Sequence, residues 1–225
     1  MRPIIVTKTL VASSANNIAL SQTPTSGTAL TLNGSTVSGG VAVLDTQRRI
    51  LLTYGNEASP RTMVITGTDD AGMVISETLS IPSGAPGTVP TLQNFKTVTS
   101  ALPLGGGWSA AVTLGTNTVG STPWFVPTAH IAPFELGVGL VLLSGAATFS
   151  FEATREVVNA QPAVLPVGAS IAPPIVNSVE WPGLAALAAT TYGSVTAASI
   201  NGWRLTVLTG TGLVECTVTQ SGIRL

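Results

Sequence analysis

The stretch TMVITGTDDAGMVISETLSI, residues 62–81, decides the fold class. Two β-rich runs, residues 62–68 and 73–81, flank the loop DDAG, where Gly72 can supply the left-handed conformation of a short hairpin turn. Apolar and polar residues alternate along the second run, as in a sheet that is wet on one face, and Glu77 is the exception on the apolar face. The stretch therefore predicts an antiparallel β-hairpin.

Two later stretches carry similar signals on either side of a glycine-containing link. Residues 135–143 and 148–154 flank SGAA, and residues 203–208 and 213–220 flank TGTG. We predict a hairpin at each of these links. Cys216 alternates inward with apolar neighbours and is interpreted as a small core residue.

Helix signals are nearly absent, because 15 prolines and 24 glycines leave few windows with a 3.6-residue period. Residues 181–190 are the exception and allow two helical turns at most. Many short strands between turns predict an all-β fold of two antiparallel, jelly-roll-like β-sandwich domains with extended arms. A proline-rich crossing at residues 120–133 divides domain 1–124 from domain 125–225, and the second domain carries a proline-rich insertion at residues 159–182.

The composition is poor in charge. Hydrophobic residues make up 44% of the chain and charged residues 8%, far below the roughly 25% of soluble proteins. A chain of this kind is expected to hide much of its surface against other subunits, which predicts a homo-oligomer. The single Cys216 excludes an intramolecular disulfide framework and fits assembly in a reducing cytoplasm.

The charge and apolar patterns also exclude two classes of partner. The net charge is −1 and only Arg48 and Arg49 adjoin, so no nucleic acid is expected to bind. The longest apolar stretch, residues 136–143, is far shorter than the roughly 20 residues of a spanning helix, so no membrane is expected either. Lys8 and two threonines interrupt the N-terminal apolar run, which we interpret as an arm or first strand and not as a signal peptide.

Motifs of catalysis and metal binding are weak. His130 is the only histidine, which argues against a metal pair and a serine-based triad. The DDAG loop lacks the spaced ligands of a calcium loop. Gly137 and Gly139 resemble half of a phosphate-binding fingerprint but interrupt a strand instead of opening a helix. We expect no catalytic residue, no metal and no cofactor, and hence no enzyme.

Four tryptophans allow two interpretations. They can form a sugar-binding platform, or they can anchor the core and subunit contacts, where tryptophan is enriched. We expect the second role, with Trp124 and Trp181 as assembly contacts.

A series of short phrases, in order over most of the chain, carries a resemblance to a known group of proteins. They are residues 14–19, 30–34, 42–45, 48–50, 64–81, 95–100, 115–117, 120–124, 133–139 and 200–207. On these phrases the chain resembles a common group of tailed-bacteriophage virion proteins of structural type. Residues 159–182 match least. The resemblance implies a component of the virion, present in many copies, with other virion proteins of the capsid, the portal or neck, or the tail as partners, and it brings no catalytic residue.

Two apolar and nearly uncharged segments are expected to carry the subunit contacts. One is the N-terminal arm, residues 1–10, and the other is the proline-rich stretch 159–174. Their expected contact residues are Ile4, Ile5, Val6, Val164, Leu165, Val167 and Ile171. Left in water, such segments would expose apolar surface worth about 25 cal/mol for each square ångström later buried. The alternative is that both arms fold back on their own chain.

Together these observations predict a non-enzymatic virion protein that decorates or stabilises a capsid by self-association and docking. The alternatives are a neck, collar or tail component, a glycan-binding receptor spike, and, with least support, a hydrolase. The copy number in the particle distinguishes a capsid lattice from a neck.

Overall fold

The structure is a computed structural model and describes residues 4–127, 131–156, 158, 179–181, 183–195 and 200–224. These residues form antiparallel strands joined by turns and bends, and they contain no helix. The predicted all-β class is therefore confirmed. The chain divides into two compact units, and we call Ser13–Thr118 the first unit and the described residues before and after it the second unit.

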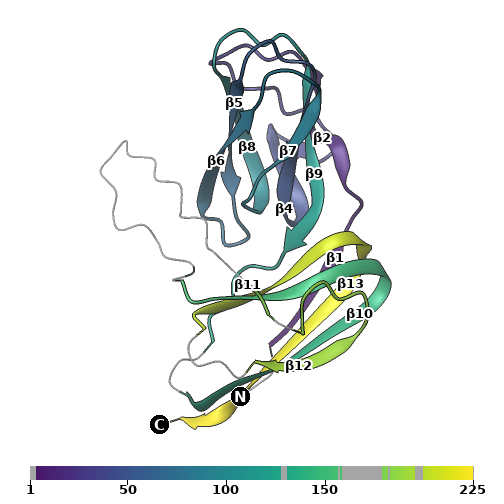
Figure 1. Cartoon of the computed structure of the whole chain (residues 1–225), viewed down its shortest axis with the longest axis vertical. Helices are drawn as coiled ribbons and strands as arrows, with labels where there is room; N and C mark the ends of the chain where they lie inside the picture. Colours follow the sequence, from purple (N-terminus) through teal and green to yellow (C-terminus); the bar gives the residue numbers. More distant parts are fainter. Residues whose placement is uncertain are drawn as a thin grey trace, which may run out of the picture. The chain divides into compact units, whose positions relative to one another are not determined.

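The first unit contains most of the short strands. They are β2 (Ser14–Gln22), β3 (Val37–Ser38), β4 (Val41–Tyr54), β5 (Arg61–Thr68), β6 (Val74–Ile81), β7 (Gly87–Pro90), β8 (Phe95–Leu104) and most of β9 (Val112–Ser121). Four of them, β4, β8, β5 and β6, lie side by side in that order (Figure 1). Strands β3 and β7 pair with β4, and β2 pairs with β9. Alternate residues such as Ile50, Leu52, Met63, Ile65 and Phe95 are fully buried and form the core of this unit.

The hairpin predicted at residues 62–81 is confirmed as β5 and β6. They pair without a register shift from Arg61↔Ile81 to Thr68↔Val74. Gly72 has the expected positive φ of 79°. Glu77 is the exception in the alternating pattern. Its carboxylate accepts hydrogen bonds from the backbone N–H groups of Leu92 (2.7 Å) and Gln93 (2.9 Å).

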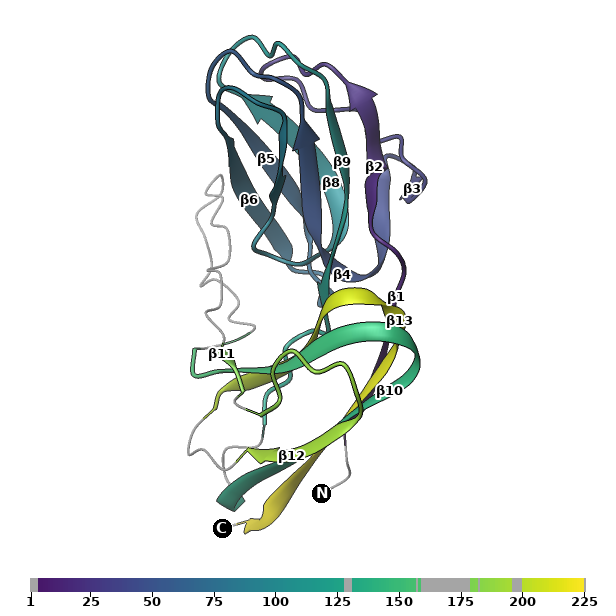
Figure 2. The ribbon, with the colours of Figure 1, turned by 45° about the vertical axis from the view of Figure 1, so that its right-hand side comes forward.

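The second unit is built on two very long strands, β10 (Ile131–Thr154) and β13 (Gly202–Arg224). They pair with each other from Ile131↔Arg224 to Thr154↔Gly202. Strand β1 (Ile4–Leu10) pairs with β13, while β11 (Val179–Glu180) and β12 (Thr191–Val195) pair with β10. Figure 2 shows β10 and β13 curving together round one bend.

The two hairpins predicted in this region are therefore wrong. The links SGAA and TGTG lie inside β10 and β13, at the bend, and the strands pair with each other. Glycine is required at the bend because the backbones of β10 and β13 approach each other too closely there for a Cβ atom. A Cβ at Gly210 would lie 2.1 Å from the carbonyl oxygen of Ala146, and one at Gly145 would lie 2.5 Å from that of Thr211. The glycines thus permit close strand approach and not chain reversal.

Both halves of each long strand face one core. Its members include Leu136, Val138, Leu140, Phe149, Phe151, Trp203, Leu205, Val207, Val214, Cys216 and Val218. The prediction that Cys216 is a core residue is confirmed, since it is fully buried. Division into two sandwich domains stays a prediction.

The expected domain boundaries need a correction at the N-terminus. The sequence places residues 4–10 in a domain 1–124, but they pair with β13 of the second unit, from Ile4↔Val218 to Leu10↔Gly212. The first unit ends at Thr118, earlier than the predicted boundary. The reason is that β1 alternates apolar residues toward the core of the long strands, where Leu10 is buried and Ile4 and Val6 pack partly.

The short helix allowed at residues 181–190 is also wrong for the described part of that stretch. Gly183 and Ala186 have positive φ angles of 81° and 49°, which a right-handed helix cannot accommodate. The chain instead hydrogen-bonds to β10, and Leu187 exchanges two backbone bonds of 2.8 Å with Phe149.

Gly210→Ala is expected to destabilise the protein more than Gly72→Ala. Both glycines have positive φ, so alanine at either position costs about 1 kcal/mol. A Cβ at residue 72 meets nothing within 4 Å, whereas the contact with Ala146 at residue 210 adds roughly 1–3 kcal/mol of overpacking. Urea unfolding of the two variants measures this difference, and equal losses would contradict the close approach at the bend.

Candidate functional site

The N-terminal arm is an edge strand of its own chain. Ile4 and Val6 pack partly against the core of the second unit, while Ile5 is 59% exposed on the opposite face. For residues 4–10 the structure agrees with the alternative in which the arm folds back. Ile5 points outward, and β13 is the only described strand that pairs with β1.

The second expected arm falls outside the described residues. Val164, Leu165, Val167 and Ile171 all lie there. The described residues that flank the stretch lie at one end of β10. Val158 is buried and lies close to Gly202, and Val179 pairs with Ala153.

The two tryptophans expected at assembly contacts are both half-buried. The guanidinium of Arg204 lies 4.5 Å from the centre of the Trp124 ring, and Arg204 Nε donates to Glu152 at 2.7 Å. Trp181 packs against the core and donates its backbone N–H to Phe151 at 2.9 Å. Each tryptophan thus has a clear role within its own unit.

The other two tryptophans are buried, Trp108 at 8% and Trp203 at 1% exposure. The four together do not form an exposed sugar-binding platform, because the core takes two of them.

The outer face of the second unit is a four-stranded surface that we call the β12–β1 face. Its central row crosses the strands as Tyr192, Gly139, Thr217 and Ile5. The Tyr192 ring lies over Gly139, since its Cδ1 and Cε1 are 3.2 Å from where a Cβ of Gly139 would stand, and the residue is 77% exposed. The next row contains Val141, Glu215 and Thr7. Tyrosine is enriched at the hot spots of binding surfaces.

Sequence reasoning missed Tyr192. The run TTYGS has no clear alternation of its own, so nothing local places the ring outward. The GVG pattern at Gly137 and Gly139 gives a weak signal, because a glycine in a strand leaves room for a large cross-strand neighbour. That pattern fits the close approach of the Tyr192 ring and, at Gly137, of Thr219 Oγ1.

The outer face of the first unit is the β6–β8 face, formed by β6, β5 and β8. Its rows follow the registers Thr68↔Val74 and Thr68↔Thr97 at one end, and Thr62↔Ser80 and Thr62↔Leu104 at the other. It consists of Val74, Ser76, Thr78, Ser80, Thr62, Val64, Thr66, Thr68, Thr97, Ser100, Leu102 and Leu104. None of these residues carries a charge.

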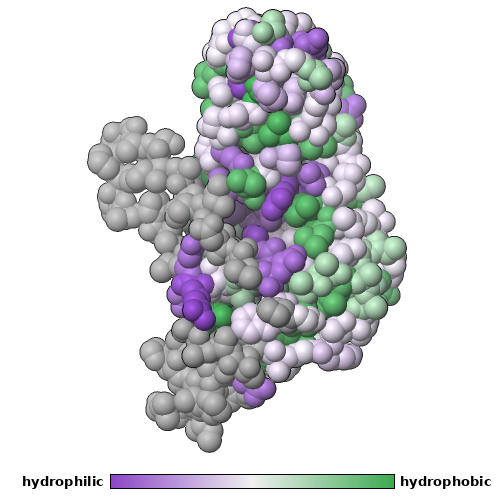
Figure 3. All heavy atoms as spheres, viewed as in Figure 1, coloured by the Kyte–Doolittle hydropathy of each residue, from purple (hydrophilic) through white to green (hydrophobic). Residues whose placement is uncertain are grey.

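Hydroxyl groups on the β6–β8 face bond to each other. Thr68 Oγ1 lies 2.8 Å from Thr97 Oγ1, and Thr66 Oγ1 lies 3.2 Å from Ser76 Oγ. Hydroxyl groups that bond to each other bind less water, so less water has to be removed when a partner covers the face. The view in Figure 3 agrees with the composition, because most of its coloured surface is pale and the strongly hydrophilic spots are few.

Several charged side chains of the first unit form hydrogen bonds or ion pairs within that unit. Arg48 is buried and donates to the carbonyl oxygen of Asn117 through Nε (3.2 Å) and Nη2 (2.8 Å), with Asp45 3.3 Å from its Nη1. Lys96 Nζ donates to the carbonyl oxygens of Leu44 and Asp45. These charges hold the irregular part of β4 and are not directed to a ligand.

The buried Glu57 and the half-buried Arg61 form a clamp at the start of β5. The Glu57 carboxylate accepts hydrogen bonds from the backbone N–H groups of Ser109 (3.1 Å) and Ala110 (3.0 Å) and from the Ser109 hydroxyl (3.1 Å). It also lies 3.5 Å from Arg61 Nε. Burial acts to raise the pKa of Glu57, but the hydrogen bonds from Ser109, Ala110 and Arg61 outweigh burial and lower it below the ordinary 4.5. The carboxylate therefore stays ionised and holds the loop before β9.

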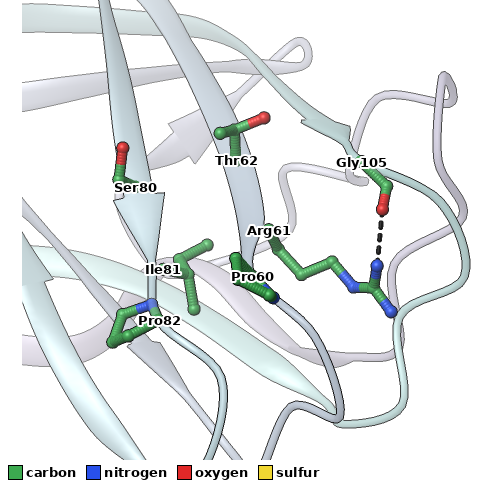
Figure 4. A pocket seen from close by; sticks show the side chains of 7 residues that line it. All are labelled: Pro60, Arg61, Thr62, Ser80, Ile81, Pro82 and Gly105. Atoms are coloured by element: carbon green, nitrogen blue, oxygen red, sulfur yellow. Dashed lines mark hydrogen bonds between the residues drawn. The ribbon is translucent and has the colours of Figure 1, made fainter.

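An open pocket of about 300 Å³ lies beside this clamp. Pro60, Arg61, Thr62, Ser80, Ile81, Pro82 and Gly105 line it. Figure 4 shows the Arg61 guanidinium bonded to the carbonyl oxygen of Gly105, away from Pro60 and Pro82. Arg61 also donates to Gly107. The guanidinium is thus committed to the backbone, and the pocket presents mainly proline rings and two hydroxyls.

Among the described residues, no three His, Cys, Asp or Glu side chains gather closely enough to hold a metal ion. His130 lies outside the described residues. The part of the chain that the structure describes includes no helix long and apolar enough to cross a membrane.

No protein-family model matches the chain. No curated protein matches it either.

The Cys216 thiol is expected to resist alkylation in the folded protein. Burial, with a smaller contribution from the negative charge of Glu215, raises the pKa of Cys216 to about 12. The thiolate is the reactive form, so labelling at neutral pH should require unfolding. Because the folded pKa is raised, the stability that this thiol contributes is fully present below pH 9 and is lost as the pH rises toward 12. Mass spectrometry after iodoacetamide treatment, with and without urea, measures the labelling, and rapid labelling without urea would contradict the burial.

Proposed function

We propose that the chain is a non-enzymatic structural protein of a tailed-bacteriophage particle, which decorates or stabilises the capsid by self-association and by docking onto other virion proteins. The observation that carries the proposal is the uncharged β6–β8 face. A sheet face of Ser, Thr, Val and Leu is suited to broad contact, because no ion loses its hydration when the face is covered.

The distribution of charge supports the same proposal. Charged residues make up only 8% of the chain, and several of them, such as Arg48, Glu57 and Arg61, are used inside the first unit. A lattice of identical neighbours strengthens weak uncharged contacts, because each bound contact raises the effective concentration for the next. Docking to a repeating surface therefore requires no large charged patch.

A glycan-binding spike is the second candidate, and Tyr192 favours it. Its exposed ring lies on the sheet beside Thr217 and can stack against a sugar ring. A neck, collar or tail component remains a further alternative within the structural class and differs from decoration in copy number.

Thr78→Lys is expected to weaken particle binding at least tenfold. Thr78 is exposed on the β6–β8 face, so the free protein tolerates a lysine, whereas docking would have to remove water from its charge. Sedimentation of labelled chain with particles that lack it measures retention. Leu20→Lys, at a 45% exposed position of β2, is the matched control and should bind as the unmodified chain does.

Equal retention of the Thr78→Lys and Leu20→Lys variants would overturn docking through this face. Binding of the full chain to a glycan array that is lost in Tyr192→Ala would instead favour the spike.

A further inference from the structure

Strand β1 is an edge strand among the described strands, and Lys8 is the one residue in it that usually protects such an edge against pairing. It pairs with β13 along all of Ile4–Leu10, and no other described strand pairs with it. The pairing contains no bulge, no proline lies between residues 4 and 10, and Lys8 is its only charged residue. Natural edge strands are normally blunted by such devices. This edge instead offers a row of backbone donors and acceptors to another strand.

We propose that β1 pairs antiparallel with β1 of a second copy of this chain, about a twofold axis at Thr7, so that the β12–β1 faces of the two copies form one continuous sheet. This inference rests on the proposed function in one respect: it names the partner and the contact through which self-association occurs. The twofold makes Ile4 face Leu10 of the second copy, Ile5 face Thr9, and Val6 face Lys8.

The sequence of β1 is self-complementary in this register. Ile4, Val6, Lys8 and Leu10 of both copies stay on the core side, and Ile5, Thr7 and Thr9 stay on the outer side, so residues of the same side face each other across the axis. Lys8 faces a valine and not its own symmetry mate. The threonines at the axis face each other, which is a favourable cross-strand pair.

Other registers pair the two β1 strands less favourably. A shift by one residue would place core-side residues opposite outer-side residues. An axis at Lys8 would place two like charges opposite each other, and an axis at Val6 would leave Thr9 and Leu10 without a partner. The register centred on Thr7 alone pairs all of β1 without placing like charges directly opposite each other.

Disulfide trapping tests the register directly. Opposite residues of an antiparallel pair have Cα atoms about 4.5–5.5 Å apart, within the span of a disulfide. Thr7→Cys should therefore give a covalent dimer on mild oxidation. Ile5→Cys is the matched control, because residue 5 would be four residues from its symmetry mate, about 13 Å along the strand, and should not cross-link. The buried Cys216 gives no background in the folded protein.

A charge-pair series tests the same contact without cross-linking. Ile5→Lys with Thr9→Lys places like charges opposite each other and should raise the dimer dissociation constant at least tenfold. Ile5→Lys with Thr9→Glu places opposite charges there and should restore it. Both positions are exposed in the single chain, so circular dichroism should show an unchanged fold. Sedimentation velocity of the full chain measures the dissociation constants.

Three outcomes would overturn the inference. They are a monomeric unmodified chain with no Thr7→Cys cross-link, cross-linking of Ile5→Cys in preference to Thr7→Cys, and equal dissociation constants for the two charge variants. Thr78→Lys separates this result from the proposed function, since it should dimerise normally and yet bind particles weakly. A chain that binds particles but does not pair through β1 would leave docking intact and remove only the twofold contact.

Discussion

Trp203→Ala is expected to lower the free energy of unfolding by about 3–5 kcal/mol. Trp203 is 1% exposed and is stacked between two rings, with centroid distances of 4.6 Å to Phe125 and 5.6 Å to Phe151. It also lies at one end of the paired long strands, opposite Ala153. Its removal leaves a cavity that the surrounding strands cannot close, because each is fixed by its own ladder of hydrogen bonds.

Urea unfolding followed by far-ultraviolet circular dichroism measures this loss. Tyr192→Ala is the matched aromatic control and should change the free energy by no more than about 0.5 kcal/mol, since Tyr192 is largely exposed. A loss below about 1 kcal/mol for Trp203→Ala would mean that this ring is not the centre of the second core.

Glu57→Gln is expected to lower the free energy of unfolding at pH 7 by about 3 kcal/mol. The glutamine keeps the size of the side chain but removes the charge that pairs with Arg61, and its amide group turns a donor toward the N–H groups of Ser109 and Ala110. The guanidinium of Arg61, whose side chain is 11% exposed, is then left without the Glu57 carboxylate.

The effect should depend on pH in one direction. The folded-state pKa of Glu57 is lowered, so its contribution to stability is present above the ordinary pKa of 4.5 and is lost as the pH falls through the folded pKa. The difference between the unmodified chain and Glu57→Gln should therefore shrink when urea midpoints are measured at pH 3 instead of pH 7. Glu215→Gln, on the outer face of β13, is the control with little expected effect at either pH. A difference that grows on acidification would contradict the clamp.

The hairpin at residues 62–81 could be predicted because its information is local. The turn carries Gly72 at the position of positive φ, and the alternation of Ile75, Leu79 and Ile81 sets the buried face. Both signals lie within one short stretch, so no distant partner was needed to interpret them.

The long strands could not be predicted in the same way. A glycine between two alternating runs is compatible with a chain reversal and also with a tight bend, and only the partner strand decides between them. At Gly145 and Gly210 the partner is a distant segment whose carbonyl oxygens occupy the space of the missing Cβ. Local pattern therefore gave two hairpins where non-local pairing gives two bent strands.

The candidate surfaces also depend partly on local signals and partly on non-local pairing. Alternation predicted that Val74, Ser76, Thr78 and Ser80 share the wet side of β6. That residues of β8 belong to the same surface follows only from the pairing of both strands with β5. Ile5 belonged to the expected contacts and lies outward, whereas Ile4 and Val6 of the same set face the core. Tyr192 is visible only once Gly139 is known to lie opposite it.

The number of copies of this chain in each purified phage particle tests the proposed function most directly. Quantitative mass spectrometry of particles from the host strain, scaled to a capsid protein of known number, gives this value. Decoration of a capsid lattice predicts copies on the order of hundreds, because the strength of docking comes from many repeated contacts. A dozen or so would move the chain to the neck, and particles that lack the chain altogether would contradict its role as a virion protein.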